Sequence, residues 1–282
     1  MPRATERRSA STPTIVHRFQ SGGSALTIPD LLATEEPLEI RLTAGASDRP
    51  VAMTMRTPGN DFELAAGFLY AEGVLRGKAG LLSVRYCQPP AEQQYNTVTV
   101  DLRGPMPELD GLDRHFLTTS ACGVCGKASL DQIAELGGPP LGEGPLVSSE
   151  LLLSLPARLG DAQKVFAKTG GVHAAALFDA EGNLECVRED VGRHNAMDKL
   201  VGWALLSDRL PLTDRLVMVS GRASFELLQK CLRAGAGVFC AVSAPSSLAV
   251  DVARRFGMTL VGFLREEGFT VYAGESRITG NS

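Results

Sequence analysis

The chain has 282 residues, 44% of them hydrophobic, which is enough for a sizeable core in one large domain or two modest ones. Its net charge of −4 and aromatic content of 6%, with a single Trp, give no support for binding nucleic acid or a membrane surface. The apolar runs have strand length, far below the roughly 20 residues that span a bilayer. Residues 1–14 contain several arginines followed by Ser, Thr and Pro, so we expect a disordered tail and no secretory signal.

The first half, residues 15–140, predicts a small α+β domain. Alternating apolar and polar residues predict two pairs of strands, over residues 37–43 with 51–56 and over 81–87 with 95–102. Between the pairs, apolar residues from Phe62 to Leu69 recur with helical spacing, and Gly73 ends this helix. A Gly- and Pro-rich stretch from residue 137 to 145 places the domain boundary between residues 140 and 141.

The second half, residues 141–282, alternates strands with helices of roughly ten residues. Strands are expected at 172–178, 184–188, 216–219, 237–243, 259–264 and 269–272. Helices are expected at 148–155, bent or interrupted at Pro156, and at 162–167, 195–206, 224–232 and 248–256. This order predicts a layered α/β domain whose sheet is largely parallel at its centre.

Residues 118–127 hold the most reactive side chains of the chain. Cys122 and Cys125 stand three positions apart, each is followed by Gly, and Lys127 lies just beyond. A Cys-x-x-Cys spacing and a following helix N-terminus both lower the pKa of a thiol, and the thiolate is the reactive form. The remaining cysteines occur singly, and of these Cys186, Cys231 and Cys240 are expected to be buried. Six cysteines in a chain of this length, without a signal sequence, indicate a reducing cytoplasm rather than a disulfide scaffold.

The spacing of this pair fits four roles. A structural zinc site needs four ligands, and no second Cys-x-x-Cys or His pair is present. Thiol–disulfide exchange usually places the pair after a strand in a βαβ unit, which the irregular upstream segment does not provide. Sulfur relay through a persulfide needs a thiolate on a Gly-flanked loop that can meet two partners, and this composition matches. The fourth role is a buried structural pair, and spacing alone leaves the choice open.

Polar turns that contain Gly or Ser follow three of the expected strands, and each turn precedes a helix. In open α/β sheets ligands collect at the carboxyl ends of strands, and the free N–H groups of a first helical turn bind phosphate. We therefore predict a phosphate-bearing ligand at this edge. The residues expected to contact it are Arg193, Ser220, Gly221 and Arg222.

His173 follows a Gly-Gly turn at the start of a strand, so it is a further candidate for this site. A His-x-Glu motif with a later Pro-Cys-x-x-Cys marks zinc nucleobase deaminases. Here Ala175 occupies the position of that Glu, and Cys231 and Cys240 are not in such a motif. Zinc deaminase chemistry is therefore not expected.

Five separated motifs occur in one order along the chain. They cover residues 119–126, 169–177, 189–199, 219–224 and 262–265. Together they resemble the formate dehydrogenase accessory sulfurtransferase family (FdhD), and the likeness extends from residue 37 to residue 272. The resemblance implies a mixed-sheet α/β fold in which a cytidine-deaminase-like C-terminal domain without the zinc motif follows a smaller α+β domain.

The resemblance also implies a function. It implies a cytoplasmic homodimer, without a resident metal, that takes persulfide sulfur from a cysteine desulfurase. The sulfur passes to the molybdenum cofactor in its bis(molybdopterin guanine dinucleotide) form before insertion into the catalytic subunit of formate dehydrogenase. Cys122 matches the persulfide-bearing cysteine, with Cys125 as its partner. A chaperone that binds the cofactor without relaying sulfur is the alternative, and zinc in stoichiometric amount would favour a zinc enzyme.

The resemblance places cofactor contacts at the end of the strand over residues 259–264. The matching residues are Phe263, Leu264, Arg265, Glu266, Glu267 and Gly268. Members of the family often carry a more basic or Gly-rich run after the Phe. Because carboxylates facing phosphates are unfavourable, we expect Glu266 or Glu267, or both, to point away and the backbone to make the contacts.

Overall fold

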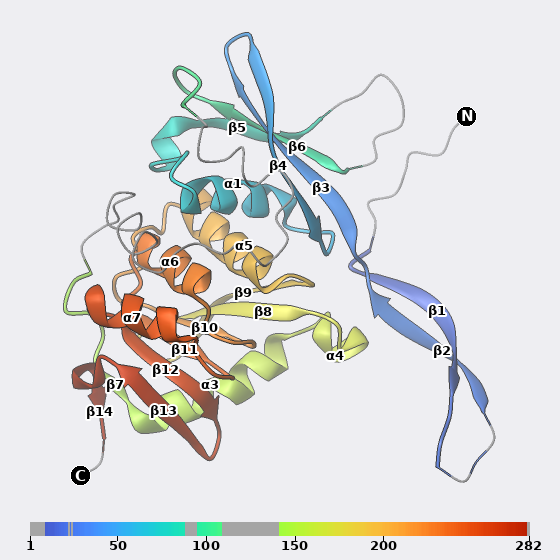
Figure 1. Cartoon of the computed structure of the whole chain (residues 1–282), viewed down its shortest axis with the longest axis vertical. Coiled ribbons are helices and arrows are strands. Elements are labelled where there is room, and N and C mark those ends of the chain that lie inside the picture. Colours follow the sequence, from blue (N-terminus) through green and yellow to red (C-terminus); the bar gives the residue numbers. More distant parts are fainter. Residues whose placement is uncertain (1–8, 22, 24, 88–94, 109–140, 281–282) are drawn as a thin grey trace.

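The computed structural model describes residues 9–21, 23, 25–87, 95–108 and 141–280. A four-stranded and a six-stranded sheet lie on opposite sides of a layer of helices, and a two-stranded arm projects from this body (Figure 1). The strands are β1 (Ser11–Arg18), β2 (Leu26–Ala33), β3 (Glu36–Ala44), β4 (Ser47–Arg56), β5 (Leu81–Tyr86), β6 (Thr97–Leu102), β7 (Val147–Ser148), β8 (His173–Phe178), β9 (Leu184–Asp190), β10 (Leu216–Val219), β11 (Val238–Ala241), β12 (Thr259–Arg265), β13 (Gly268–Ala273) and β14 (Ile278–Thr279). The helices are α1 (Asp61–Ala71), α3 (Ser149–Ala162), α4 (Phe166–Thr169), α5 (Arg193–Leu206), α6 (Phe225–Arg233) and α7 (Ser247–Arg255), with 3₁₀ turns at Lys78–Gly80 and Glu275–Arg277.

The four-stranded sheet has the order β4-β3-β6-β5 and contains both predicted strand pairs. β3 pairs with β4 and β5 pairs with β6 in antiparallel fashion, whereas β3 and β6 are parallel neighbours. Alternate residues of β3, namely Leu38, Ile40 and Leu42, are fully buried, as expected for a strand with one face on the core. The predicted helix over residues 62–69 is α1, which packs against this sheet.

The six-stranded sheet is mixed, in the order β13-β12-β11-β10-β8-β9. Only β10, β11 and β12 run parallel, joined by the crossover helices α6 and α7. β8 and β9 form a hairpin, as do β12 and β13, because short turns can join only antiparallel strands. The prediction of a largely parallel centre is thus confirmed for three adjacent strands. The α/β class is confirmed, and the likeness to a cytidine-deaminase fold stays a prediction.

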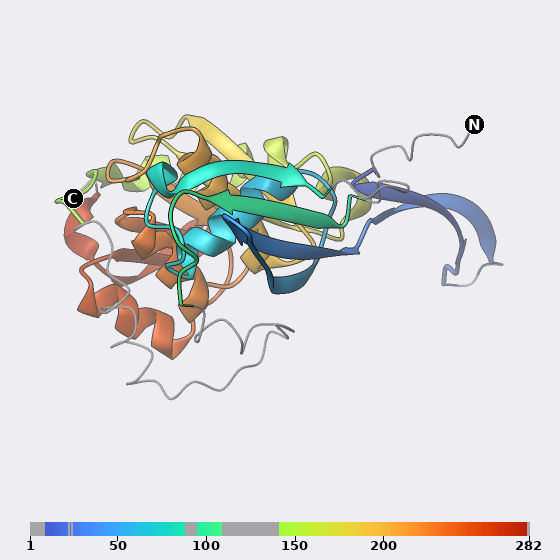
Figure 2. The same ribbon diagram turned by 90° about the horizontal axis from the view of Figure 1, so that it is seen from above.

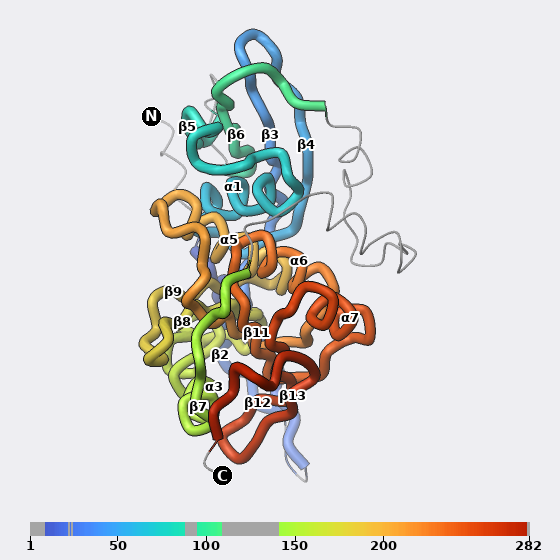
Figure 3. Tube along the Cα trace, turned by 90° about the vertical axis from the view of Figure 1, so that its left-hand side faces the viewer, coloured from blue at the N-terminus to red at the C-terminus, as the bar shows by residue number. Residues whose placement is uncertain are grey.

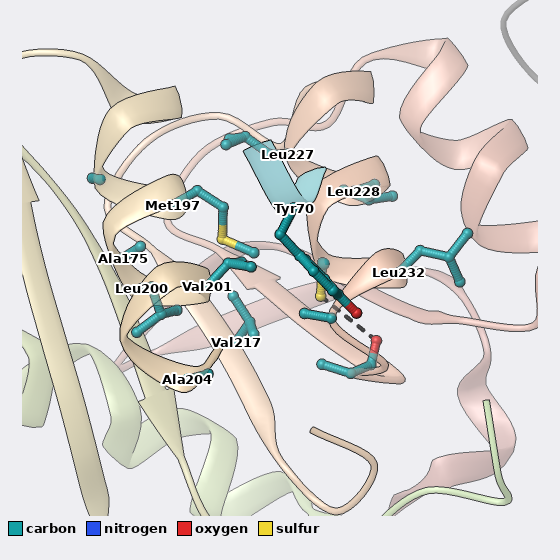
Figure 4. Packing of buried hydrophobic residues seen from close by; sticks show 14 of the residues in the cluster. Tyr70, Ala175, Met197, Leu200, Val201, Ala204, Val217, Leu227, Leu228 and Leu232 are labelled. Atoms are coloured by element: carbon teal, nitrogen blue, oxygen red, sulfur yellow. Dashed lines mark hydrogen bonds between the residues drawn. The ribbon is translucent and has the colours of Figure 1, made fainter. Parts of the chain in front are cut away.

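Both faces of this sheet are covered, and β8 shows how. Ala174, Ala176 and Phe178 belong to the core beneath α3, whereas Ala175 and Leu177 belong to the core formed with α5, α6 and α7. Figure 4 shows this second core, where α5 and α6 pack over the strands and the Tyr70 hydroxyl donates to the Arg233 carbonyl over 2.9 Å. Ser148 caps the N-terminus of α3, since its hydroxyl accepts a hydrogen bond from Leu151 N, and the helix continues through Pro156 without interruption.

The two halves of the chain meet where α1 crosses α5 (Figure 3). A Cβ atom added to Gly67 of α1 would lie 1.9 Å from the Asp198 carbonyl oxygen, and one added to Gly202 of α5 would lie 1.8 Å from the Glu63 carbonyl oxygen. The helix backbones are therefore in contact, which only glycine permits. One hydrophobic core runs from the four-stranded sheet through this crossing to the six-stranded sheet. The domain division at residues 140 and 141 stays a prediction.

The arm differs from expectation. β1 begins at Ser11 and pairs with β2 from Ser11 opposite Ala33 to Arg18 opposite Leu26. The predicted disordered tail over residues 1–14 is therefore wrong for residues 11–14, because the β-branched residues Thr12 and Thr14 extend a strand that Ile15 and Val16 continue. Among the described helices, none combines the length and apolar character required to cross a bilayer.

The helix crossing predicts a strong effect of one methyl group. We expect Gly202→Ala to lower the free energy of unfolding by at least about 3 kcal/mol, because the Cβ must displace backbone atoms of α1. Gly160→Ala is the matched control: it also lies in a helix, but nothing is within 4 Å of its added Cβ, so a gain of up to about 1 kcal/mol is expected. Urea unfolding measures both, and equal effects at the two sites would contradict the crossing.

Candidate functional site

The carboxyl ends of β10, β11 and β12 lie at one edge of the sheet because these strands are parallel. β8 is antiparallel to β10, so its first residue, His173, reaches the same edge. Hydrogen bonds tie the segments that follow the strands into a row: Ser220 N donates to Ala174 O over 3.0 Å, Ser243 N to Gly221 O over 3.3 Å and Phe263 N to Ser243 O over 3.2 Å. The predicted residues of β8, β10 and β12 are thereby brought together.

His173, Arg193 and Gly221 meet at the centre of this row. A Cβ added to Gly221 would lie 3.4 Å from His173 Nδ1 and 4.0 Å from Arg193 Cδ, so this glycine keeps the space between the two side chains open. The Nε of Arg193 is buried and has no hydrogen-bond partner among the described residues. Buried polar groups are nearly always paired, so this guanidinium is available to an anionic ligand.

The Ser220 hydroxyl accepts a hydrogen bond from Ala174 N over 2.9 Å and so holds the turn against β8, and its contact with a ligand stays a prediction. Arg222 is exposed beyond Gly221 and leads into α6. The α5 and α6 N-termini lie side by side, since His194 Nε2 is 3.4 Å from Ser224 Oγ and 3.6 Å from Glu226 Oε2. Sequence reasoning missed Glu226, whose only signal was its place in the first turn of a helix.

The electrostatics of the site favour a neutral His173. Burial lowers the pKa of this imidazole, and the positive charge of Arg193 lowers it further, against the opposing effect of Asp190. The neutral ring carries one donor and one acceptor nitrogen. His173 can therefore orient a polar ligand without adding to the positive charge of Arg193.

The segment from Phe263 to Gly268 reaches the site through its first residue. Phe263 has φ of +52°, a rare conformation for a bulky residue, and its side chain is 44% exposed. The pairing of β12 with β13 is irregular between Gly262 and Arg265, which bends the strand end. Leu264 is buried in the core beneath α3, whereas Arg265 is exposed. Glu266 and Glu267 form the exposed turn into β13.

A buried polar cluster fixes the turn that carries Arg193. The Asp190 carboxylate accepts hydrogen bonds from Gly192 N over 2.9 Å and from Thr57 N over 3.1 Å, and it lies 2.7 Å from Lys199 Nζ. Asn195 joins Asp190 to Met55 O of the first half, with distances of 3.2 and 2.7 Å. The sequence motif over residues 189–199 includes Asp190, Asn195 and Lys199 of this cluster. It gave no sign of their partners Met55 and Thr57, which lie more than a hundred positions earlier.

A cavity of about 340 Å³ lies beside this cluster, between the β4–α1 loop and β9. Two lysines, Lys164 and Lys199, line it, and Lys199 is already used, since its Nζ also donates to Thr57 O over 2.8 Å. Glu189, another lining residue, accepts from Val165 N and Phe166 N over 2.9 and 2.8 Å. The edge of the sheet, where the buried Nε of Arg193 has no partner within the described part of the chain, is the candidate taken here for an anionic ligand.

The cysteines divide into two groups. Cys122 and Cys125 lie outside the described residues, so their roles stay predictions. The expected burial of Cys186, Cys231 and Cys240 is confirmed. Burial raises the pKa of Cys186 and that of Cys240 to about 12, which keeps both thiols protonated and unreactive near neutral pH.

The fold and the site together define an α/β protein in which the carboxyl ends of three parallel strands meet at one edge, beside the buried Nε of Arg193. The chain belongs to the FdhD/NarQ family, whose family model matches residues 33–279. It is 53% identical to the "Sulfur carrier protein FdhD" of Streptomyces avermitilis, with 99% of this chain and 97% of that protein covered. The protein of that name from Mycobacterium tuberculosis is 50% identical, covering 93% of this chain and 96% of its own length.

A solved structure shows the same fold. The crystal structure of a putative formate dehydrogenase accessory protein from Desulfotalea psychrophila has a TM-score of 0.73 with this chain. The two share 24% sequence identity, and the match covers 96% of this chain and 100% of the other. The arrangement of the sheets described above is therefore also found in a more distant protein.

The site predicts the titration of His173. By NMR we expect the midpoint for its imidazole to lie below 6.5, and Arg193→Gln to raise it, because one positive neighbour is removed while burial remains. The unfolded chain then binds the proton more readily than the fold, so this residue weakens stability as the pH falls below about 6.5. The exposed Arg254 gives the control variant Arg254→Gln, and an identical shift in both variants would contradict the proximity of Arg193.

Proposed function

We propose that this protein is a cytoplasmic sulfur carrier that acts as an accessory to formate dehydrogenase. Relatives that share about half of their residues with this chain, aligned over nearly its whole length, bear the name "Sulfur carrier protein FdhD". In this proposal a cysteine desulfurase supplies sulfur to Cys122 as a persulfide. The acceptor is the molybdenum cofactor in its bis(molybdopterin guanine dinucleotide) form, which is then inserted into the catalytic subunit of formate dehydrogenase.

The two cysteines allow a balanced transfer. The Cys122 thiolate attacks the outer sulfur of the desulfurase persulfide, a sulfur–sulfur bond breaks, and the desulfurase cysteine leaves as a thiolate. Attack by the Cys125 thiolate on the inner sulfur of the Cys122 persulfide then forms a Cys122–Cys125 disulfide and releases the outer sulfur as sulfide for the metal. A thiol reductant must reduce this disulfide before the next cycle.

One observation carries the acceptor site: the buried Nε of Arg193 lacks a partner among the described residues at the edge kept open by Gly221. A guanine dinucleotide supplies the phosphate oxygens that such a guanidinium binds. The neutral imidazole of His173 can form a further hydrogen bond to the ligand beside Arg193. The backbone from Phe263 onward adds contacts on the other side of Ser243, while the exposed turn of Glu266 and Glu267 leaves room for an anion.

The same geometry also fits the second candidate function, a chaperone that binds the cofactor without relaying sulfur. The two proposals share the strand-edge site and differ only in the chemistry of Cys122 and Cys125. Sulfur labelling therefore decides between them.

Labelling tests the relay. Incubated with a cysteine desulfurase and ³⁵S-cysteine, the protein is expected to take up label, and its Cys122 peptide to gain about 32 Da, one sulfur atom. We expect Cys122→Ala to lose the label. Cys186→Ala is the control, because that thiol is buried and protonated, and it should keep the label. Full labelling of Cys122→Ala together with retained accessory activity would show that the relay does not use Cys122, whereas an active protein that takes up no label would favour the chaperone.

Nucleotide binding tests the acceptor site. With guanosine diphosphate as the probe, Arg193→Gln is expected to weaken binding at least about tenfold, since a charge-assisted hydrogen bond contributes roughly 1.5–3 kcal/mol. Arg254→Gln, which changes an exposed arginine on α7, should bind as the unchanged protein does. Isothermal titration calorimetry gives both affinities. If Arg193→Gln bound guanosine diphosphate as tightly as the unchanged protein does, the nucleotide would not bind at the strand edge.

A further inference from the structure

The strand edge holds a second imidazole, that of His194, which follows directly on Arg193 at the start of α5. Its Nε2 faces the first turn of α6, where it lies 3.6 Å from Glu226 Oε2 and 3.4 Å from Ser224 Oγ. The imidazole side chain is 27% exposed and the carboxylate side chain 53%, so a ligand in solution can reach both. This pair is the only contact between a histidine and a carboxylate within 4 Å in the described part of the chain.

The neighbouring His173 shows that the charges of this edge act on one another. Burial and Arg193 lower the pKa of His173, and His194 lowers it as well. Charges shift a pKa mainly at short range, so the two imidazoles and the guanidinium share one site. The carboxylate near His173 is Asp190, which is already paired with Lys199. A proton brought to this edge is therefore held better by His194, which has Glu226 beside it.

A buried ion pair one helical turn deeper fixes the position of Glu226. Asp198 lies four positions after His194 on α5, and Lys230 lies four positions after Glu226 on α6. Residues four apart share one face of a helix. The Asp198 carboxylate accepts from Lys230 Nζ over 2.7 Å, and both side chains are more than nine-tenths buried. This inner pair sets the register of the two helices, and in that register the outer pair meets.

Glu226 carries its negative charge throughout the neutral pH range. The contact with His194 lowers the pKa of Glu226 to about 2, against the opposing effect of burial, and hydrogen bonds from its own backbone N–H and from Ser224 lower it further. A carboxylate beside an imidazole favours the protonated ring. At 3.6 Å the two groups are an ion pair rather than a short hydrogen bond, so the contact can shorten when His194 gains a proton.

The charges around His194 decide when it gains this proton. They come from α5, α6 and the start of β8, and they are those of Arg193, Asp198, Glu226, Lys230 and His173. The inner pair neutralises itself, whereas Arg193 opposes a proton on His194 and Glu226 favours it. A phosphate bound to Arg193 removes the opposition, because its negative charge offsets that of the guanidinium. Imidazole is the side chain whose charge changes most readily near neutral pH.

We propose that His194 is a further ligand-binding residue of the strand edge, that Glu226 is its positioning residue, and that a phosphate-bearing ligand binds there together with one proton on His194. This inference rests on the proposed nucleotide site and adds its pH dependence. Because the bound state takes up a proton, the affinity rises as the pH falls through the range in which His194 titrates, by up to about tenfold per pH unit. Above that range the ligand binds without this contribution.

Calorimetry measures the proton directly. Guanosine diphosphate is titrated into the full-length protein at about pH 7.5, where its terminal phosphate, with a second pKa near 6, is almost fully ionised. In buffers of different ionisation enthalpy, the slope of the binding enthalpy against that enthalpy gives the number of protons taken up. We expect at least about half a proton per nucleotide. His194→Gln should abolish this uptake, and Glu226→Gln should reduce it, because His194 would then gain its proton only at lower pH.

His17→Gln is the matched control. This histidine lies in β1, on the arm that projects from the body (Figure 2), where its ring contacts Thr27, so its loss should leave the proton uptake unchanged. A purely structural role of Glu226 would change the affinity in Glu226→Gln without changing the number of protons. Circular dichroism shows whether each variant is folded, and the His194 variant decides alone if Glu226→Gln does not fold.

The outcomes separate this inference from the proposed function. Nucleotide binding without proton uptake by the unchanged protein, or undiminished uptake in His194→Gln, would overturn the inference and leave the nucleotide site in place. Undiminished uptake in a folded Glu226→Gln would overturn the positioning role. If the unchanged protein did not bind guanosine diphosphate, or if Arg193→Gln bound it equally well, both the site and this inference would be wrong. Sulfur labelling of Cys122 in the same variants tests the relay independently.

Discussion

The close crossing of α1 and α5 is the constraint on which the arrangement of this protein depends. Gly67 and Gly202 let two helix backbones touch, and this contact places the β4–α1 loop of the first half against β9 and the start of α5 in the second. A side chain on either glycine would separate the helices. The crossing therefore sets not only the packing of the two sheets but also the position of the polar residues beside it.

Next to the crossing, Asp190 and Lys199 form a fully buried ion pair, and each of them also hydrogen-bonds the backbone of Thr57. An unpaired buried charge is costly, so this pair ties the two halves in one register. Its Asp190 also holds Gly192, and thereby the turn of Arg193. The backbone of the first half at Thr57 thus helps to position Arg193, because it hydrogen-bonds Asp190.

Much of the site could be predicted from the sequence because it follows local rules. Strand ends, turns with small residues and helix starts are each encoded over a few positions, and Arg193, Gly221 and His173 were found in this way. The sequence did not show that the Ser220 hydroxyl also holds β8, because this depends on a backbone donor of a strand more than forty positions away. Glu226 was missed, since its approach to His194 depends on how α5 and α6 pack.

The sequence by itself determined the class of fold, most strands and helices, the burial of the isolated cysteines and the family, because periodicity and contiguous motifs report on short-range structure. Tertiary structure alone decided the mixed order of the six-stranded sheet, because pairing of its strands depends on how the whole chain folds. It alone decided the contact of Gly67 with α5 and that of Asp190 with Thr57, since these join residues more than a hundred positions apart. It also decided that residues 11–14 belong to an arm, because a polar strand is recognised only with the partner strand that its backbone pairs with.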